Sequence, residues 1–282
     1  MPQETCNAAW SVARAFFDLP LDHKLAVRSG DPGCPRGYFP VREEALARTR
    51  GIAAPPDQKE SYSSGPLCAP ASHTKTDEFD FFYGPNIWPA APAGFRQAWT
   101  NYYVAMERLG SQIMQLLASA LRLDDEYFAG FHTHHLSALR ALNYPSITDE
   151  CLPGQQRAGA HSDYGSVTIL QPDLSVAGLE VQLPSGAWIG APIVENAFIV
   201  NIGDLMARWT NDRWVSTLHR VVDPAGPPGS PAPRRQSIAY FMNPNYDAEI
   251  STIPTCLDPG ESPKYPPLLA GRYLIEQFNS AI

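Results

Sequence analysis

The periodicity of the sequence changes near residue 136, and this change constrains the fold more than any other feature. Before it, apolar residues recur at helical spacing in segments 8–28 and 95–123. After it come short apolar and β-branched segments separated by turn residues, namely 137–144, 166–172, 179–184, 187–191, 197–203, 218–223 and 234–243. Many short strands with frequent turns are typical of a sandwich or barrel. The pattern predicts an α+β, mainly β protein with N-terminal helices packed on a jelly roll.

The helical and the β part are expected to form one domain over residues 1–282. Its parts would be a helical and loop-rich region (1–135), a jelly-roll core with the functional site (136–250) and a C-terminal segment (251–282). Pro20 is expected to separate two N-terminal helices, and a short helix is expected at Asp125–His132. Residues 29–94 are rich in proline, glycine and aromatic residues, which predicts long ordered loops over the core.

Charge and apolar patterning exclude several classes of function. The net charge is −8, and the longest basic run is Arg234-Arg235, which argues against a nucleic-acid-binding surface. No stretch approaches the length of apolar sequence that a membrane-spanning helix needs. The five cysteines form no CxxC motif, and the first residues lack the order of a signal peptide. These features predict a cytoplasmic protein without membrane contact.

Three residues could bind one metal ion. His161 and Asp163 are two positions apart at the head of an apolar segment, and such side chains share one face of an extended strand. His219, at the edge of a later strand, is the candidate for a third ligand. Taken singly, these residues fit a surface histidine, a turn-forming aspartate and a buried histidine. Together, two imidazoles and one carboxylate form the facial triad of non-haem Fe(II) oxygenases, which leaves three coordination positions open.

A second pair indicates a carboxylate-binding site. Arg235 and Ser237 lie two residues apart on a predicted strand and would face the same way. A guanidinium beside a hydroxyl can clamp a carboxylate, and Tyr144 could add a phenol. A dicarboxylate could then chelate the metal at one end while Arg235 holds the other.

With these residues in place, the chain resembles the 2-oxoglutarate and Fe(II)-dependent dioxygenases, most closely the isopenicillin N synthase-like branch. The segments that carry the resemblance are HSD, LHR and RQS, with RGYFP, GPNIWP, NYP, GLEVQ and NIGDLMARWTNDRW. It implies a distorted double-stranded β-helix with Fe(II) on His161, Asp163 and His219. The co-substrate 2-oxoglutarate would lie on Arg235, Ser237 and Tyr144. Oxygen would be the oxidant, and ascorbate a stimulant.

The resemblance also implies a reaction and a substrate pocket. A small organic molecule, such as a secondary metabolite, would be hydroxylated, desaturated or rearranged, with release of succinate and CO2. Its pocket would be lined by residues of the RGY loop, an aromatic segment and the strand after RQS, namely Tyr38, Phe39, Phe82, Phe241 and Asn243. Two departures are that Leu142 replaces an asparagine common in plant members, and that the family usually opens with a further strand and helix.

Two other functions are compatible with the same residues. One is a 2-oxoglutarate-independent Fe(II) oxidase of the isopenicillin N synthase type, which uses the same Arg-x-Ser pair for its substrate. The other is a catalytically silent jelly-roll protein that binds a ligand without consuming O2. Further conspicuous residues are assigned structural roles. Asp204 would cap a helix or a turn, two tryptophans would lie in the core, and three histidines would form a helix-end or loop patch (Trp209, Trp214, His132, His134 and His135).

Overall fold

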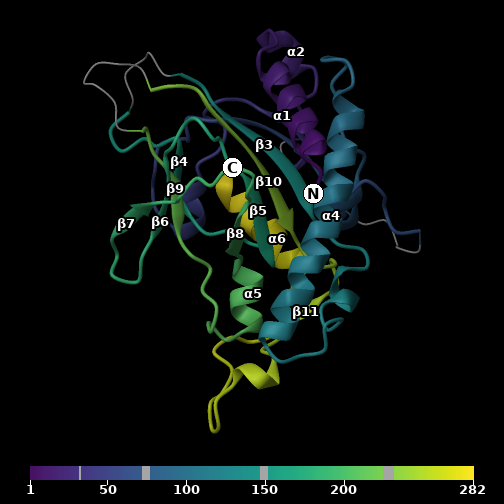
Figure 1. The fold of residues 1–282 in the computed structure, drawn as a ribbon, viewed down its shortest axis with the longest axis vertical. Coiled ribbons are helices and arrows are strands. Elements are labelled where there is room, and N and C mark those ends of the chain that lie inside the picture. The colour runs from purple at the N-terminus through teal and green to yellow at the C-terminus, as the bar shows by residue number, and fades with distance from the viewer. Residues whose placement is uncertain (32, 72–76, 147–151, 225–231) are drawn as a thin grey trace.

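The computed structural model describes residues 1–31, 33–71, 77–146, 152–224 and 232–282. Two helices open the chain, α1 (Gln3–Phe17) and α2 (Leu21–Leu25), and Pro20 lies between them as expected. The longest helix, α4 (Phe95–Ala120), packs against α1 (Figure 1). The helix expected at Asp125–His132 is wrong in extent, because only the single 3-10 turn η2 (Ala129–His132) forms there.

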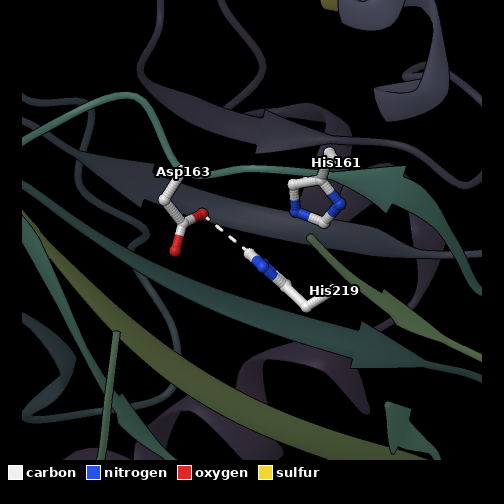
Figure 2. Close-up of side chains that lie close together, drawn as sticks. All are labelled: His161, Asp163 and His219. Carbon is white, nitrogen blue, oxygen red and sulfur yellow. Dashed lines mark ion pairs between the residues drawn. The ribbon is translucent and has the colours of Figure 1, made fainter. Parts of the chain in front are cut away.

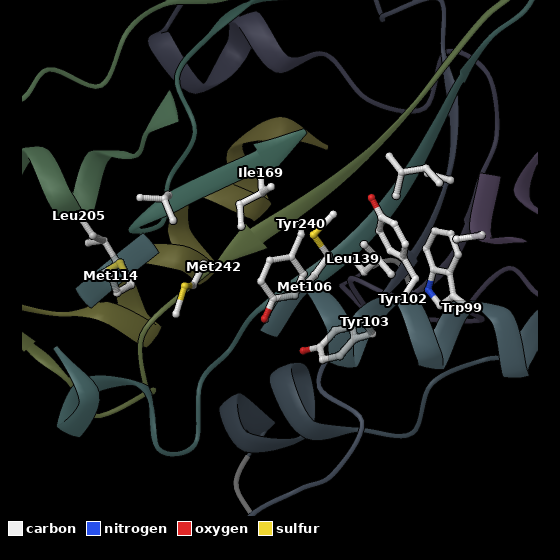
Figure 3. Packing of buried hydrophobic residues seen from close by; sticks show 14 of the residues in the cluster. Trp99, Tyr102, Tyr103, Met106, Met114, Leu139, Ile169, Leu205, Tyr240 and Met242 are labelled. Atoms are coloured by element: carbon white, nitrogen blue, oxygen red, sulfur yellow. The ribbon is translucent and has the colours of Figure 1, made fainter. Parts of the chain in front are cut away.

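A six-stranded sheet forms the larger half of the β structure. Its strands in spatial order are β1 (Gly37–Phe39), β2 (Glu60–Ser64), β3 (Ala138–Tyr144), β10 (Arg235–Met242), β5 (Val167–Gln171) and β8 (Ile199–Ile202). All neighbouring strands are antiparallel. One face packs on α4, where Trp99, Tyr103 and Met106 meet side chains of the central strands (Figure 3). This contact buries the apolar stripe of the helix and fixes the sheet against it.

A smaller, four-stranded sheet lies beside the first (Figure 1). It has the order β4 (Ala158–His161), β9 (His219–Val221), β6 (Leu179–Gln182) and β7 (Trp188–Gly190). One cavity is lined by residues of both sheets, so their inner faces enclose it. The chain is therefore a two-sheet jelly roll with helices on one side, as the sequence predicts. The remaining elements are α3 (Asp77–Tyr83), α5 (Asp204–Trp209), α6 (Ala270–Ala281), β11 (Glu249–Ile250), β12 (Leu268–Leu269), η1 (Leu46–Arg50) and η3 (Pro254–Cys256).

The prediction that residues 29–94 are only loops is wrong. This segment supplies β1 and β2 of the large sheet, together with η1 and α3. All five residues of β2 (sequence ESYSS) are buried, so the strand has no alternation of polar and apolar residues. Its polar side chains are instead satisfied inside the protein, as shown by the contacts of Glu60 with Lys24 and Asn143. A local pattern search cannot recognise such a strand.

Some of the structural assignments need correction. Asp204 does not cap a helix: it is the first residue of α5, Gly203 is the N-cap, and no side chain caps this helix. The Asp204 carboxylate instead accepts hydrogen bonds from Ser162 and Tyr273. The Trp209 side chain is buried in the core, as predicted. Within the described residues, no helix is both long and apolar enough to cross a lipid bilayer.

Two histidines of the predicted patch, His132 and His135, have partners inside the protein. The His132 imidazole contacts the Phe128 carbonyl oxygen at 2.9 Å and Ser166 Oγ at 3.2 Å. Its burial lowers its pKa to about 4, so the ring is neutral near pH 7. His135 lies 3.0 Å from a carboxylate oxygen of Glu107 on α4.

Candidate active site

The three predicted metal ligands converge at the ends of two strands. His161 is the last residue of β4, and His219 is the first residue of β9 and its direct partner across the ladder. One ligand atom from each of His161, Asp163 and His219 lies within 4.8 Å of the others (Figure 2). In that view the Asp163 carboxylate points at the His219 ring, with Oδ1 3.6 Å from Nε2.

The reason for this convergence differs from the one predicted. Asp163 does not lie on a strand with His161, because β4 ends at His161 and β5 begins only at Val167. The two strands belong to different sheets. Asp163 therefore lies where the chain crosses from the small sheet to the large one, and the crossing turns its side chain toward the histidines.

Backbone carbonyls orient both imidazoles. His161 Nδ1 lies 2.7 Å from the Gly159 carbonyl oxygen, and His219 Nδ1 lies 3.1 Å from that of Thr217. Each Nδ1–H can donate to its carbonyl, which leaves Nε2 of each ring with a free lone pair. Metal-binding histidines in proteins are commonly held in this way by a hydrogen bond from the second nitrogen.

The protonation states also suit a cation. Burial and the neighbouring His219 ring lower the pKa of His161 to about 3, so its imidazole is neutral. Burial opposes ionisation of Asp163, but the His219 and His161 rings and a hydrogen bond from Asn201 keep its pKa below the usual value. Asn201 Nδ2 donates to Asp163 Oδ2 at 2.7 Å, and Oδ1 remains directed at the histidines. The neutral His161 imidazole and the ionised Asp163 carboxylate are in the forms that metal binding requires.

A cavity of about 90 Å³ extends from the triad between the two sheets. Arg235 lines it, and this side chain is only 2% exposed. Its Nη1 donates to Ser237 Oγ at 3.4 Å, and the guanidinium carbon lies 5.1 Å from the centre of the Tyr144 ring. Its Nε has no partner, and no carboxylate in the described parts of the chain forms an ion pair with it. A buried cation without a counter-ion matches the free carboxylate of 2-oxoglutarate.

A second cavity, of about 160 Å³, is lined by two of the three triad residues, His161 and Asp163. Leu142 and Phe241 line both cavities, so Leu142, which replaces the asparagine of plant members, stands at their junction. Of the predicted substrate residues, the structure brings Phe82, Phe241 and Asn243 to this wall. It does not place Tyr38 or Phe39 there.

These two residues pack behind the cavity wall. The Tyr38 hydroxyl donates to Glu60 at 2.5 Å in the core. The Phe39 ring lies 4.7 Å from the guanidinium carbon of Arg140 and packs on the Phe278 ring. Phe39 therefore supports two residues that do line the cavity.

A buried charge network forms one side of the second cavity. Lys59 Nζ lies 2.9 Å from Glu44 and 3.1 Å from Asp57, and Arg140 Nη2 lies 2.7 Å from Glu44. Burial would raise the pKa of Glu44, but Arg140 and Lys59 outweigh this effect and hold it at about 2. Asp57 also accepts a hydrogen bond from the Gly159 backbone N–H at 2.9 Å. The network thus connects the large sheet to the strand that carries His161.

Reasoning from the sequence missed several lining residues. One of them, Arg140, shares the inward alternation of β3 with the recognised Tyr144, so period-two counting could have found it. Asn201, on β8, had no recognised neighbour on its strand. The aromatic and aliphatic wall from α6, Leu274 and Phe278, has no such signal. Only the folding of the C-terminal helix over the jelly roll brings those side chains near the triad.

A jelly roll with two histidines and one carboxylate at its mouth defines a mononuclear non-haem iron oxygenase. The model of the 2OG-Fe(II) oxygenase superfamily matches residues 136–244, and that of the non-haem dioxygenase N-terminal region matches residues 1–91. The chain belongs to the 2OG-Fe(II) oxygenase superfamily. Like its relatives, it is a 2-oxoglutarate-dependent dioxygenase that oxidises a small organic substrate.

Individual relatives support this assignment over the two alternative functions. The 2-oxoglutarate-Fe(II) type oxidoreductase hxnY of Emericella nidulans is 34% identical over 95% of this chain and 75% of its own. Validamycin A dioxygenase of Streptomyces hygroscopicus is 32% identical over 98% of this chain and 74% of its own. The crystal structure of a full-length Neurospora crassa protein in complex with alpha-KG superimposes with a TM-score of 0.85 at 36% identity, covering 99% of this chain and 84% of that one. The same Neurospora protein has been solved with alpha-KG and thymine.

Proposed function

We propose that His161, Asp163 and His219 hold the Fe(II) of this oxygenase, and that Arg235, Ser237 and Tyr144 hold the distal carboxylate of 2-oxoglutarate. The observation that carries the proposal is the buried, unpaired guanidinium of Arg235 in a cavity that opens on three convergent ligand atoms. A molecule with a carboxylate at one end and a chelating 2-oxo acid at the other satisfies both features.

The residues around the cofactor site have separate tasks. Arg235 neutralises and orients the distal carboxylate, and Ser237 Oγ lies beside its guanidinium. Leu170, Leu179 and Val221 form an apolar lining that excludes water. Fe(II), when bound, supplies activation of O2 coupled to decarboxylation of 2-oxoglutarate to succinate and CO2. Ascorbate, as a reductant, would keep the iron ferrous.

The prime substrate is proposed to occupy the cavity of about 160 Å³ on the other side of Leu142. This volume is below the range of about 300–1,000 Å³ typical of pockets for drug-sized ligands, which favours a small molecule. Phe82 and Phe241 would pack on its apolar part, while Asn243 offers a polar contact. The C–H bond that is oxidised would face the triad, and hydroxylation, desaturation and ring rearrangement all begin from that arrangement.

The test is an anaerobic titration of the metal-free protein with Fe(II) and then 2-oxoglutarate. Wild-type protein should develop the weak visible charge-transfer band of a 2-oxo acid chelated to ferrous iron. His219→Ala and Asp163→Ala should lose the band and the release of succinate while keeping the fold. His135→Ala, which removes an imidazole outside the site, should keep both.

Three results would contradict the proposal. Iron binding without the band on addition of 2-oxoglutarate would support the oxidase function instead. A wild-type protein that binds no iron would support the silent jelly roll. A normal band in Asp163→Ala would show that the ligand assignment is wrong.

A further inference from the structure

The substrate cavity contains a second buried arginine, which the proposed cofactor site does not use. Arg36 directly precedes β1 and is 2% exposed. It lines the cavity of about 160 Å³ together with His161 and Asp163. Its guanidinium therefore belongs to the wall that faces the proposed prime substrate, whereas Arg235 lines the other cavity.

Arg36 has no counter-ion among the described residues. No ion pair within 4.0 Å includes it, and its Nε has no hydrogen-bond partner. Within the described residues, its guanidinium forms one hydrogen bond to a side chain, from Nη1 to Cys34 Sγ at 4.0 Å. A thiol is a weak acceptor. Arginine stays protonated in proteins, so a positive charge is buried here without an ion-pair partner within 4.0 Å, and only the exposed Asp80 carboxylate favours it from a longer distance.

The other cations of this wall are compensated. Lys59 lies between Glu44 and Asp57, and Arg140 also contacts Glu44. Two positive and two negative groups thus neutralise each other within the network. Arg36 is the cation that remains, and Asp163, the other carboxylate on the wall, belongs to the proposed metal site.

Two glycines make room for the Arg36 guanidinium. A Cβ atom added to Gly65 would lie 3.0 Å from its Nε and 3.2 Å from its Nη2, and a Cβ atom at Gly84 would lie 3.4 Å from its Nη1. The first two distances are tighter than ordinary van der Waals contact. The guanidinium is therefore seated in a fixed recess rather than free to turn toward solvent.

We infer that Arg36 binds an acidic group of the prime substrate, and that the substrate is a small carboxylic acid with an apolar body. This inference rests on the proposed function, because it places the substrate in the cavity that His161 and Asp163 line. An unpaired buried guanidinium binds a carboxylate through parallel, charge-assisted hydrogen bonds. The apolar body would pack against the aromatic and aliphatic walls formed by Phe82, Phe241, Leu274 and Phe278.

The test compares acids with their uncharged amides. Protein saturated anaerobically with Fe(II) and 2-oxoglutarate is titrated with phenylacetate and cyclohexylacetate, and separately with the corresponding primary amides. Binding is measured by calorimetry and by the change in the charge-transfer band. We expect wild-type protein to bind at least one acid about tenfold or more tightly than its amide, because the amide cannot form a charge-assisted pair.

Variants locate this preference at Arg36. Arg36→Gln should abolish it, Arg36→Lys should retain part of it, and Arg108→Gln, at an exposed position on α4, should leave it unchanged. If Arg36→Gln does not fold, Gly65→Ala provides a second test, since its added Cβ would lie 3.0 Å from Nε and 3.2 Å from Nη2 and would press on the guanidinium without removing its charge. Gly65→Ala should lower the preference several-fold.

The results separate the two proposals. A charge-transfer band without any preference for acids, or with the same preference in Arg36→Gln or in folded Gly65→Ala, would overturn the role of Arg36 and leave the proposed function intact. Failure of wild-type protein to form the band would overturn the proposed function itself.

Discussion

Replacing Arg235 with glutamine should have opposite effects on the free protein and on its complex with 2-oxoglutarate. In the free protein Arg235 is a buried cation without a carboxylate partner among the described residues, so its removal relieves an uncompensated charge. The free energy of unfolding should therefore stay the same or rise. In the complex the same substitution removes the partner of the distal carboxylate, so the affinity should fall.

The loss of affinity follows from the hydrogen bonds that the guanidinium would form. Truncation of one partner in a buried, hydrogen-bonded charge pair costs about 2–4 kcal/mol. At about 1.4 kcal/mol for each factor of ten, the dissociation constant for 2-oxoglutarate should rise by about 30-fold to 700-fold.

Chemical denaturation with and without 2-oxoglutarate measures both effects. At a concentration of about 100 times the wild-type dissociation constant, the ligand should stabilise wild-type protein by about 2.7 kcal/mol. A variant with about 100-fold weaker binding should gain only about 0.4 kcal/mol, from RT ln 2. The control is Arg234→Gln, because Arg234 contacts Asp18 and Asn143 rather than the cavity.

Arg234→Gln should lower stability and leave the ligand effect unchanged. If Arg235→Gln is strongly destabilised without ligand, Arg235 has a structural partner and the reasoning fails. If it keeps the full stabilisation by 2-oxoglutarate, the distal carboxylate does not lie on Arg235.

Two further predictions concern groups next to the site. Asn201→Leu removes the hydrogen-bond donor to Asp163 Oδ2. Fe(II) binding should weaken by about 10-fold to 100-fold, as is usual when a residue that orients a metal ligand is lost. A chelator competition titration measures this affinity, and a wild-type value would contradict the prediction. Glu44, whose pKa is held at about 2 by Arg140 and Lys59 against the cost of burial, should stabilise the fold by about 3 kcal/mol at neutral pH. Because its folded pKa is below its unfolded value of 4.5, this contribution is complete above about pH 5 and is lost as the pH falls toward 2. The gap in unfolding free energy between wild type and Glu44→Gln should close over that window in urea titrations, and a gap independent of pH would show that Glu44 is not the ionised partner.

The sequence alone determined the chemistry of the candidate site. The types of the residues show which groups can bind a metal or a carboxylate. Their spacing in the sequence matches one family of oxygenases, as seen for His161, Asp163, His219, Arg235 and Ser237. Alternating segments such as 137–144 and 234–243 also predicted strands β3 and β10. Strand alternation can be predicted because it depends on side chains within a few residues of one another, and the ligand set because residue type and interval are both written in the sequence.

The tertiary structure alone decided how the site is built. Asp163 joins the histidines from a crossing between two sheets, although the sequence suggested a shared strand. Strand β2 forms from polar residues because partners distant in sequence satisfy them after burial. Arg36 becomes an unpaired cation only once the described chain is folded around it. Burial and charge compensation depend on residues far apart in the chain, and a local sequence pattern does not show which of those residues come into contact.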